Sequence, residues 1–350
     1  MELTRLTTIG MTLVGAVALL GCGDPTPPPE SANASPAEAS SPSVGQRAET
    51  WPRLARCANP IDNEISVPDV MIGAVEMRNH GAGLSVLGVP EEVSDARAST
   101  TLARIASSED SKVLVAILDA NGPDTLLASS DGGSNWIPVG NFVSPTAMAV
   151  SPDGSSVVVA DGLQVTILSL DGTESQPVLK LPDIASLAVD DLAFVDHKTL
   201  LAVISEHVAG VSDDFASLAN VWRLDLASSS WTRLTDLKAD SDRWTLAHTP
   251  VADRAGTIKF VVESGLGSGT QDDITTELWV VEQGGVPQMD KTLPIGSILV
   301  GWIGNRTVIN VPDDVGLWHI LVLVGDAAPV DLGCVRASAA ARMNGDPDFQ

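Results

Sequence analysis

Four pairs of neighbouring aspartates are the residues of this sequence best suited to chemistry. They are Asp190–Asp191, Asp213–Asp214, Asp272–Asp273 and Asp313–Asp314. Two carboxylates can divide the roles of acid and nucleophile if their environments separate their pKa values. Adjacent residues on a strand point to opposite faces, however, so a doublet alone is not a catalytic pair. The sequence favours solvated loop charge here and leaves a carboxylate-dependent hydrolase of glycans or peptides as an alternative.

The sequence contains no clear motif for a metal site or for a catalytic nucleophile. The doublets, with Asp240 and Asp242, could supply oxygen ligands to Ca²⁺, but no EF-hand loop with its spaced ligands occurs. No cofactor is therefore expected, and a structural Ca²⁺ is the one metal alternative. The histidines are scattered singly without a CxxC spacing, no G-x-S-x-G elbow exists, and the glycines of 265–269 lead back into a strand instead of a helix. No catalytic residue is assigned.

The cysteine nearest the N-terminus carries a more specific signal. An apolar run of about a dozen residues, Ile9 to Leu20, has the length of a signal-peptide core and is too short to span a bilayer of roughly 30 Å. It ends in Leu19, Leu20, Gly21 and Cys22, which resembles the bacterial lipoprotein box. The resemblance implies cleavage of residues 1–21 and diacylglyceryl modification of Cys22. The alternative is an ordinary secretory signal with an incidental cysteine.

Residues 22–50 follow as a segment rich in Pro, Ser and Ala that has few side chains large enough to bury. Such a composition cannot offset the entropy of ordering, so we expect a disordered tether. Gly23 in place of Asp after Cys22 resembles lipoproteins sorted to the outer membrane, although Asp24 weakens that resemblance. The expected location is the cell envelope, lipid-anchored at the outer membrane, on its periplasmic face or at the cell surface.

The two remaining cysteines, Cys57 and Cys334, lie 277 residues apart and bracket the rest of the chain. An exported chain meets an oxidising compartment, so we expect a disulfide between them. The chain-entropy model gives such a loop on the order of 5 kcal/mol as an upper figure.

Strand-like runs recur between these cysteines, and no segment sustains a capped helical period. The runs are Val113–Leu118, Val157–Ala160, Leu201–Ile204, Ile258–Val262 and Val308–Val311, which start 44, 44, 57 and 50 residues apart. Each is followed by a second run: Thr125–Ala128, Val165–Leu168, Val221–Leu224, Leu278–Val281 and Leu317–Leu321. Trp222, Trp279 and Trp318 fall in or at three of these and are expected at one equivalent packing position.

A period of roughly 40 to 50 residues with about four short strands per unit is typical of a β-propeller. We therefore predict an all-β chain with a propeller over residues 51–336, six blades closed by the N-to-C disulfide, and a disordered tail over residues 337–350. A β-sandwich or a two-domain all-β fold is the alternative.

Two turns resemble those of known propeller families. Ser129 to Trp136, with Ser129, Asp131, Gly133 and Trp136 at the motif positions, resembles the Asp-box of BNR repeats, in which these residues are structural. Ser151 to Gly154 resembles the turn of TolB-like and WD40-like repeats. A sialidase is excluded because such enzymes use a Tyr nucleophile and this chain has no Tyr.

The net charge is −25, from 20 Lys plus Arg against 45 Asp plus Glu. This excludes nucleic acid as a partner, because phosphate binding needs clustered cations. The sequence favours a noncatalytic binding or scaffold module that is held at the membrane by its lipid. Its expected partner is a protein or a glycan, and a protein with a basic surface suits the negative charge of this chain best.

Overall fold

The structure is a computed structural model of the whole chain. It describes residues 51, 70–72, 75–79, 84–86, 101–108, 112–119, 123–170, 179, 181–182, 186–208, 218–240, 242–253, 255–267, 270, 273–303, 306–314, 317–325 and 327–335. The predicted signal peptide, tether and tail, with Cys22 and Cys57, lie outside these residues, as do Asp213, Asp214 and Asp272.

The described residues form 22 β-strands and no α-helix. The first three sheets are β1 (Val70–Ile72), β2 (Val75–Asn79) and β3 (Leu84–Val86); β4 (Thr101–Ser107), β5 (Leu114–Asp119), β6 (Asp124–Ser129) and β7 (Ile137–Phe142); and β8 (Pro145–Val150), β9 (Ser156–Asp161) and β10 (Gln164–Ser169). An eight-stranded sheet holds β11 (Ser186–Asp196), β12 (Thr199–Glu206), β13 (Leu218–Asp225), β14 (Ser230–Arg233), β15 (Arg243–Ala252), β16 (Ile258–Leu266), β17 (Thr275–Val281) and β18 (Gln288–Leu293). The last sheet holds β19 (Ile298–Ile303), β20 (Arg306–Pro312), β21 (Trp318–Val324) and β22 (Ala327–Val335).

The eight-stranded sheet consists of two four-stranded antiparallel parts. The strands β11–β12–β13–β14 pair in sequence, and so do β15–β16–β17–β18. In the described residues the backbone pairing between the two parts is a short parallel one of β13 with β15, at Leu218 with Thr245 and Ala219 with Leu246. Each part is therefore a sheet of the same kind as β4–β7 and β19–β22.

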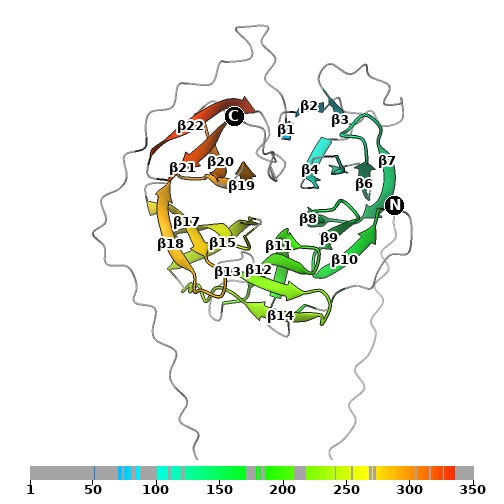
Figure 1. The fold of residues 1–350 in the computed structure, drawn as a ribbon. Helices are drawn as coiled ribbons and strands as arrows, with labels where there is room; N and C mark the ends of the chain where they lie inside the picture. Colours follow the sequence, from blue (N-terminus) through cyan, green and yellow to red (C-terminus); the bar gives the residue numbers. More distant parts are fainter. Residues whose placement is uncertain are drawn as a thin grey trace, which may run out of the picture. The chain divides into compact units, whose positions relative to one another are not determined.

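The sheets follow one another around a ring (Figure 1). The first strands β4, β8, β11, β15 and β19 lie innermost, and each packs beside the next in that order. The last strands β7, β10, β14, β18 and β22 lie on the outside. This radial arrangement of short antiparallel sheets is that of a β-propeller. In the described residues the predicted all-β fold is confirmed. Each of the ten predicted runs overlaps a strand, namely β5, β9, β12, β16 and β20 followed by β6, β10, β13, β17 and β21.

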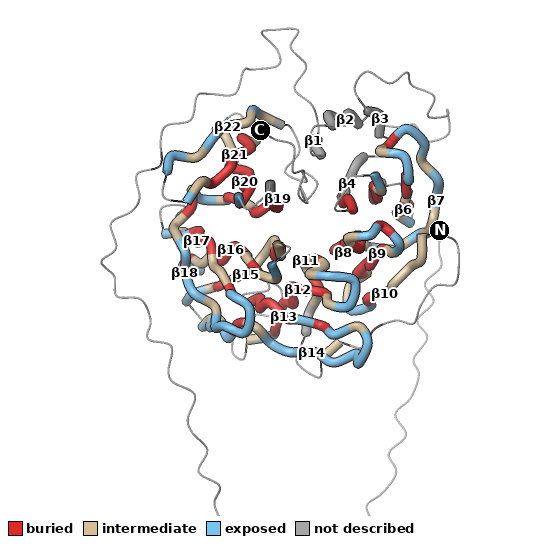
Figure 2. The backbone as a smooth tube through the Cα atoms, in the orientation of Figure 1, coloured by how far each residue is buried: buried red, intermediate tan, exposed pale blue. Residues whose placement is uncertain are grey.

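The core lies between neighbouring sheets, as the buried segments in Figure 2 show. In β12, Leu200, Ala202 and Ile204 pack toward the sheet β8–β10. Leu201 and Val203 point the other way, toward β15–β18. Both faces of the strand are thus buried, which explains why its sequence is continuously apolar instead of alternating. Each fully buried Leu or Val contributes roughly 1.5–3 kcal/mol relative to exposure.

Every described inner strand carries a β-bulge. The register of β4, β8, β11, β15 and β19 with the following strand shifts at 102–104, 145–147, 189–191, 248–251 and 299–301. A bulge bends its strand and redirects a side chain. At two of these bulges a threonine joins consecutive inner strands. Thr146 Oγ1 donates to the Val189 carbonyl at 2.6 Å, and Thr249 Oγ1 accepts from the Leu299 N–H at 3.0 Å.

The expectation of one equivalent position for three tryptophans holds for two of them. Trp222 packs into the cluster shared with β8–β10, and Trp279 into the cluster shared with β11–β14, so each faces the preceding sheet. Trp318 packs with Val300, Val308 and Ile320 on the opposite face of its sheet. Trp318 is the first residue of β21, and the alternation along a strand places it on the other side.

Candidate functional site

The Asp-box-like turn joins β6 to β7 and is held together by its own hydrogen bonds. Ser129 Oγ donates to Asp131 Oδ1 at 2.8 Å and accepts from the Gly133 N–H at 2.9 Å. Asp131 also accepts from the side chain and the N–H of Asn135. These bonds lower the pKa of Asp131 to about 2, with the Asn135 side chain as the largest cause. The Asp131 carboxylate therefore accepts its hydrogen bonds from residues of its own turn.

The turn at Ser151 to Gly154 joins β8 to β9 and repeats the same chemistry. Ser151 Oγ donates to Asp153 Oδ1 at 2.7 Å and accepts from the Ser156 N–H at 3.0 Å. The Ser151 hydroxyl and the Ser155 N–H hold the pKa of Asp153 below its usual value. Gly154 adopts a left-handed φ of 70°. The two motifs that resemble different propeller families thus share the sequence S-x-D-G and a serine-to-aspartate hydrogen bond.

The acidic doublets are not brought together by the described residues. Asp190 accepts from the Ser205 hydroxyl, and Asp191 accepts from the N–H of Leu192 at 2.8 Å. Asp273 accepts from the N–H of Thr270 at 2.7 Å. Asp240, proposed as a further oxygen ligand, accepts from the N–H groups of Asp242 and Arg243. Within the described ranges no group of three His, Cys, Asp or Glu could hold a metal ion.

A buried histidine lies beside Cys334. His319 on β21 pairs directly with Cys334 on β22. Its Nδ1 lies 2.9 Å from Asp331 Oδ2 and 3.8 Å from the Cys334 sulfur, and its Nε2 lies 3.7 Å from Asp313 Oδ2. Sequence reasoning missed this cluster, because the register of β21 with β22 decides which of these side chains meet, and a local pattern does not contain that register. Cys334, the cysteine predicted to form the disulfide, thus lies in the last sheet beside a buried histidine.

His248 is the titratable group whose chemistry is least accounted for. It lies at the bulge of the inner strand β15, and its Nε2 is buried without a hydrogen-bond partner among the described residues. Burial lowers its pKa, against the opposing effect of the carboxylates of Glu263 and Asp191. The neighbouring Thr249 has a left-handed φ of 48°, which is rare for a β-branched residue. A neutral imidazole beside carboxylates could exchange a proton, and its Nδ1 lies 3.5 Å from the Thr249 hydroxyl, which already accepts a hydrogen bond from the Leu299 N–H.

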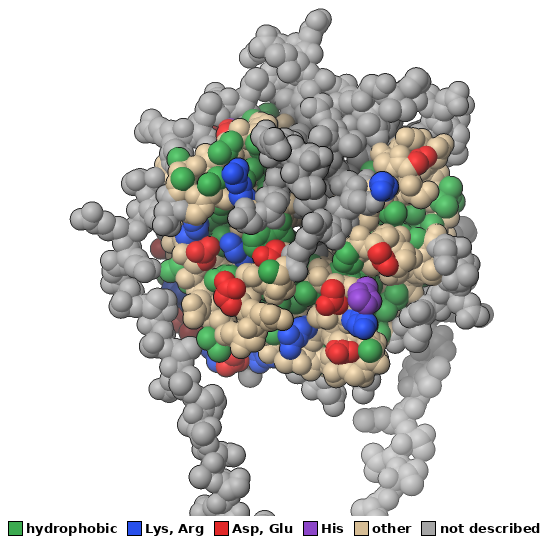
Figure 3. Space-filling view, in the orientation of Figure 1, with side chains coloured by type: hydrophobic (Ala, Val, Ile, Leu, Met, Phe, Trp, Pro, Cys, Tyr) green, Lys and Arg blue, Asp and Glu red, His purple; other side chains and the backbone are tan. Residues whose placement is uncertain are grey.

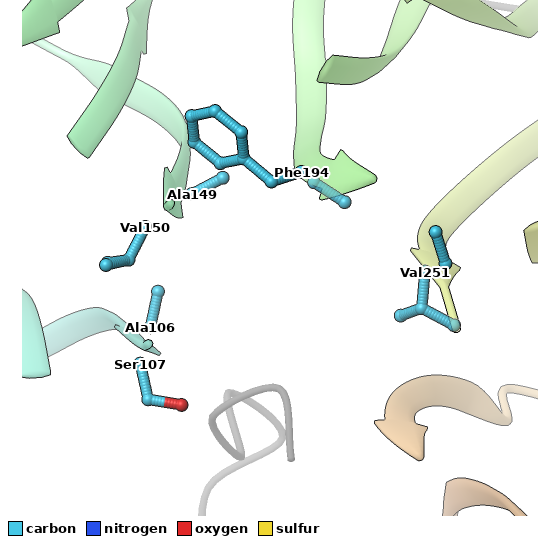
Figure 4. A pocket seen from close by; sticks show the side chains of 8 residues that line it. Ala106, Ser107, Ala149, Val150, Phe194 and Val251 are labelled. Atoms are coloured by element: carbon cyan, nitrogen blue, oxygen red, sulfur yellow. The ribbon is translucent and has the colours of Figure 1, made fainter. Parts of the chain in front are cut away.

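A shallow pocket lies where four inner strands end (Figure 4). It has about 320 Å³ of empty space, part of it open to solvent. Its lining is Ala106 and Ser107 of β4, Ala149 and Val150 of β8, Ala193 and Phe194 of β11, and Val251 and Ala252 of β15. Ser107 contributes the one polar side chain of this lining. The described side chains that line the pocket include no titratable group, so they supply none of the acid–base groups of a catalytic site.

The described surface mixes charges of both signs. On the face in Figure 3, acidic and basic side chains of the described residues lie among hydrophobic ones. The described residues include no helix that is long and apolar enough to cross a membrane.

The ring of sheets, its inner-strand bulges and its axial pocket define a β-propeller. Comparison with solved structures agrees: the chain aligns with TolB from Acinetobacter baumannii at a TM-score of 0.51 and 11% identity, over 75% of this chain and 61% of that one. It aligns with a chain of the nidogen/laminin complex at a TM-score of 0.50 and 10% identity, over 80% of this chain and 92% of that one. The chain thus spans less than two thirds of the Acinetobacter TolB chain. These likenesses show the fold alone.

Two other comparisons found nothing. No family model matches the chain, and no curated protein sequence matches it.

Proposed function

We propose that the chain is an envelope-anchored lipoprotein whose six-bladed propeller is a noncatalytic binding or scaffold module. One observation carries the noncatalytic part: the described carboxylates of the turns and doublets accept local hydrogen bonds, while the axial pocket is lined by apolar side chains.

The six-blade count rests on the sequence of sheets. The units are β1–β3, β4–β7, β8–β10, β11–β14, β15–β18 and β19–β22. Ring closure by a disulfide between Cys57 and Cys334 completes the proposal. Its support is that Cys334 lies on β22, the last outer strand, at the end of the chain that must meet the first sheet.

The lipid anchor rests on the sequence around Cys22, and it has a direct test. A clickable fatty-acid analogue supplied to the expressing cells should label the wild-type protein and leave Cys22→Ser unlabelled. The variant should also leave the membrane fraction. A wild-type protein that is freely soluble and unlabelled would remove the anchor from the proposal.

The partner class follows from the charge. A net charge of −25 accelerates encounter with basic surfaces, and salt screens this effect at a Debye length of about 8 Å near physiological ionic strength. A partner recovered from envelope extract and then purified should bind more weakly at high salt.

A matched pair of variants tests whether the partner binds at the axial pocket. Ala252→Trp fills that pocket, and Ala227→Trp places the same side chain in the outer β13–β14 hairpin. We expect only the first to weaken binding.

The outcome that would overturn the noncatalytic reading is turnover of a glycan or peptide panel that Asp191→Asn abolishes. The carboxylate-dependent hydrolase would then replace the binding module.

A further inference from the structure

Trp51 is the one described residue that precedes β1, and it lies against sheets formed much later in the chain. Its indole Nε1–H donates to the Thr292 carbonyl on β18 at 3.1 Å, across 241 residues of sequence. Its ring packs on the cluster between the sheets β15–β18 and β19–β22, which includes Leu293, Leu299 and Leu321. The side chain is neither fully buried nor fully exposed.

This pair of contacts, one polar and one apolar, suits the amphipathic side chain of a tryptophan. An indole supplies a large apolar ring to the boundary of two sheets and a polar N–H to a backbone carbonyl of the outer strand β18. A segment rich in Pro, Ser and Ala buries too little apolar surface to offset the entropy of ordering it. The first large side chain after such a segment therefore sets the point at which the chain attaches to the folded domain. Trp51 directly follows the predicted tether of residues 22–50.

We propose that Trp51 is the fastening point of the tether: it docks at the boundary of β15–β18 with β19–β22 and fixes the site on the ring from which the tether leaves. The role in anchoring rests on the proposed lipid at Cys22, but the contact itself does not.

Fastening shortens the free tether. Cys22 and Trp51 are 29 residues apart, whereas Cys22 and Cys57, the next proposed point of attachment, are 35 apart. For a flexible coil these lengths correspond to r.m.s. reaches of about 30 Å and about 33 Å. Loss of the Trp51 contact therefore lets the propeller stand farther from its anchor and frees it to turn.

Limited trypsin digestion of the full chain tests the contact without a membrane. Arg47 and Arg53 lie on either side of Trp51, and a protease must unfold several residues around the bond that it cuts. In the wild type we expect cleavage after Arg47 to be at least about tenfold faster than after Arg53, because the second site needs Trp51 to undock. In Trp51→Ala the two rates should agree within about twofold.

Two further variants make the result specific. Trp51→Phe keeps an apolar ring and loses the N–H, so its ratio should fall between those of the wild type and Trp51→Ala. Trp231→Ala on β14 also removes a partly buried tryptophan, from a different sheet, and should keep the wild-type ratio. Equal cleavage at Arg47 and Arg53 in the wild type, or the same change in Trp231→Ala, would overturn the proposal. Failure of lipid labelling at Cys22 would remove the anchor and leave the Trp51 contact standing.

Discussion

At the scale of single residues, several of the aspartates of this chain serve its turns. Asp131, Asp153, Asp225 and Asp253 each accept a backbone N–H close by in sequence. Asp accepts such bonds readily and therefore recurs where a chain reverses. A count of carboxylates suggests acid–base chemistry, but their hydrogen bonds assign these four to the fold.

Asp131 gives a test with a defined pH dependence. Its pKa of about 2 in the folded chain lies below the ordinary value of 3.8, so its ionised form stabilises the fold above about pH 4. That stabilisation is lost as the pH falls from 4 toward 2. We expect Asp131→Ala to lower the melting temperature at pH 6, and the gap from wild type to narrow by pH 2. Thermal melts across this range measure it, and a gap that stays constant would contradict the assignment.

Thr249 tests the bulge in β15. Its hydroxyl accepts from the Leu299 N–H at 3.0 Å and so ties β15 to β19. Thr249→Ser keeps the hydroxyl and should unfold within about 0.5 kcal/mol of the wild type, whereas Thr249→Ala leaves a backbone donor unsatisfied and should cost about 1 kcal/mol or more. Urea titrations compare the two free energies of unfolding. Equal values for Ser and Ala would show that the bond contributes nothing.

At the scale of elements, a hairpin position can require glycine for its left-handed backbone or for lack of space around its Cα. Gly154 and Gly162 separate these two requirements. Gly154 has a φ of 70°, and an added Cβ would lie 2.5 Å from Val113 Cγ2. Gly162 has a φ of 62°, but no atom lies within 4 Å of such a Cβ. Gly162→Ala should cost about 1–2 kcal/mol for the left-handed backbone alone. Gly154→Ala should cost more than Gly162→Ala, because Val113 must also move.

Chemical denaturation of both glycine variants gives the comparison directly. A Gly154→Ala variant no less stable than Gly162→Ala would mean that the turn against Val113 is looser than its geometry indicates.

The strands could be predicted from the sequence because both faces of each middle strand are buried, which leaves unbroken apolar runs such as Val157–Ala160. The bulges could not be predicted in the same way, although Pro250 inside the run of β15 is a signal that a regular strand is interrupted there. The positions of Trp318 and Trp51 depend on register and on contacts over long sequence distances, which a local pattern does not contain. For the same reason the cluster around His319 was not found.

At the scale of the whole molecule, a ring of sheets has one weak place, where the first sheet meets the last. Elsewhere each inner strand follows the previous one along the chain, and Thr146 and Thr249 add hydrogen bonds between neighbours. Where the ends meet, the chain does not continue, so ring closure depends on contacts between segments at opposite ends of the sequence. In the proposed closed ring, the contact between the first and last sheets holds the two ends of the propeller together.

The last prediction concerns that closure. If Cys57 and Cys334 form a disulfide, the bond closes a loop of 277 residues and restricts the unfolded chain, with on the order of 5 kcal/mol as the upper limit. We expect dithiothreitol to lower the melting temperature of the wild type and to have no effect on a Cys57→Ser, Cys334→Ser double variant, which should melt at the lower temperature in either condition. Cys22→Ser serves as the control and should keep the reductant sensitivity. Two alkylatable sulfurs in native protein from an oxidising compartment, with unchanged melting in reductant, would show that noncovalent contacts alone close the ring.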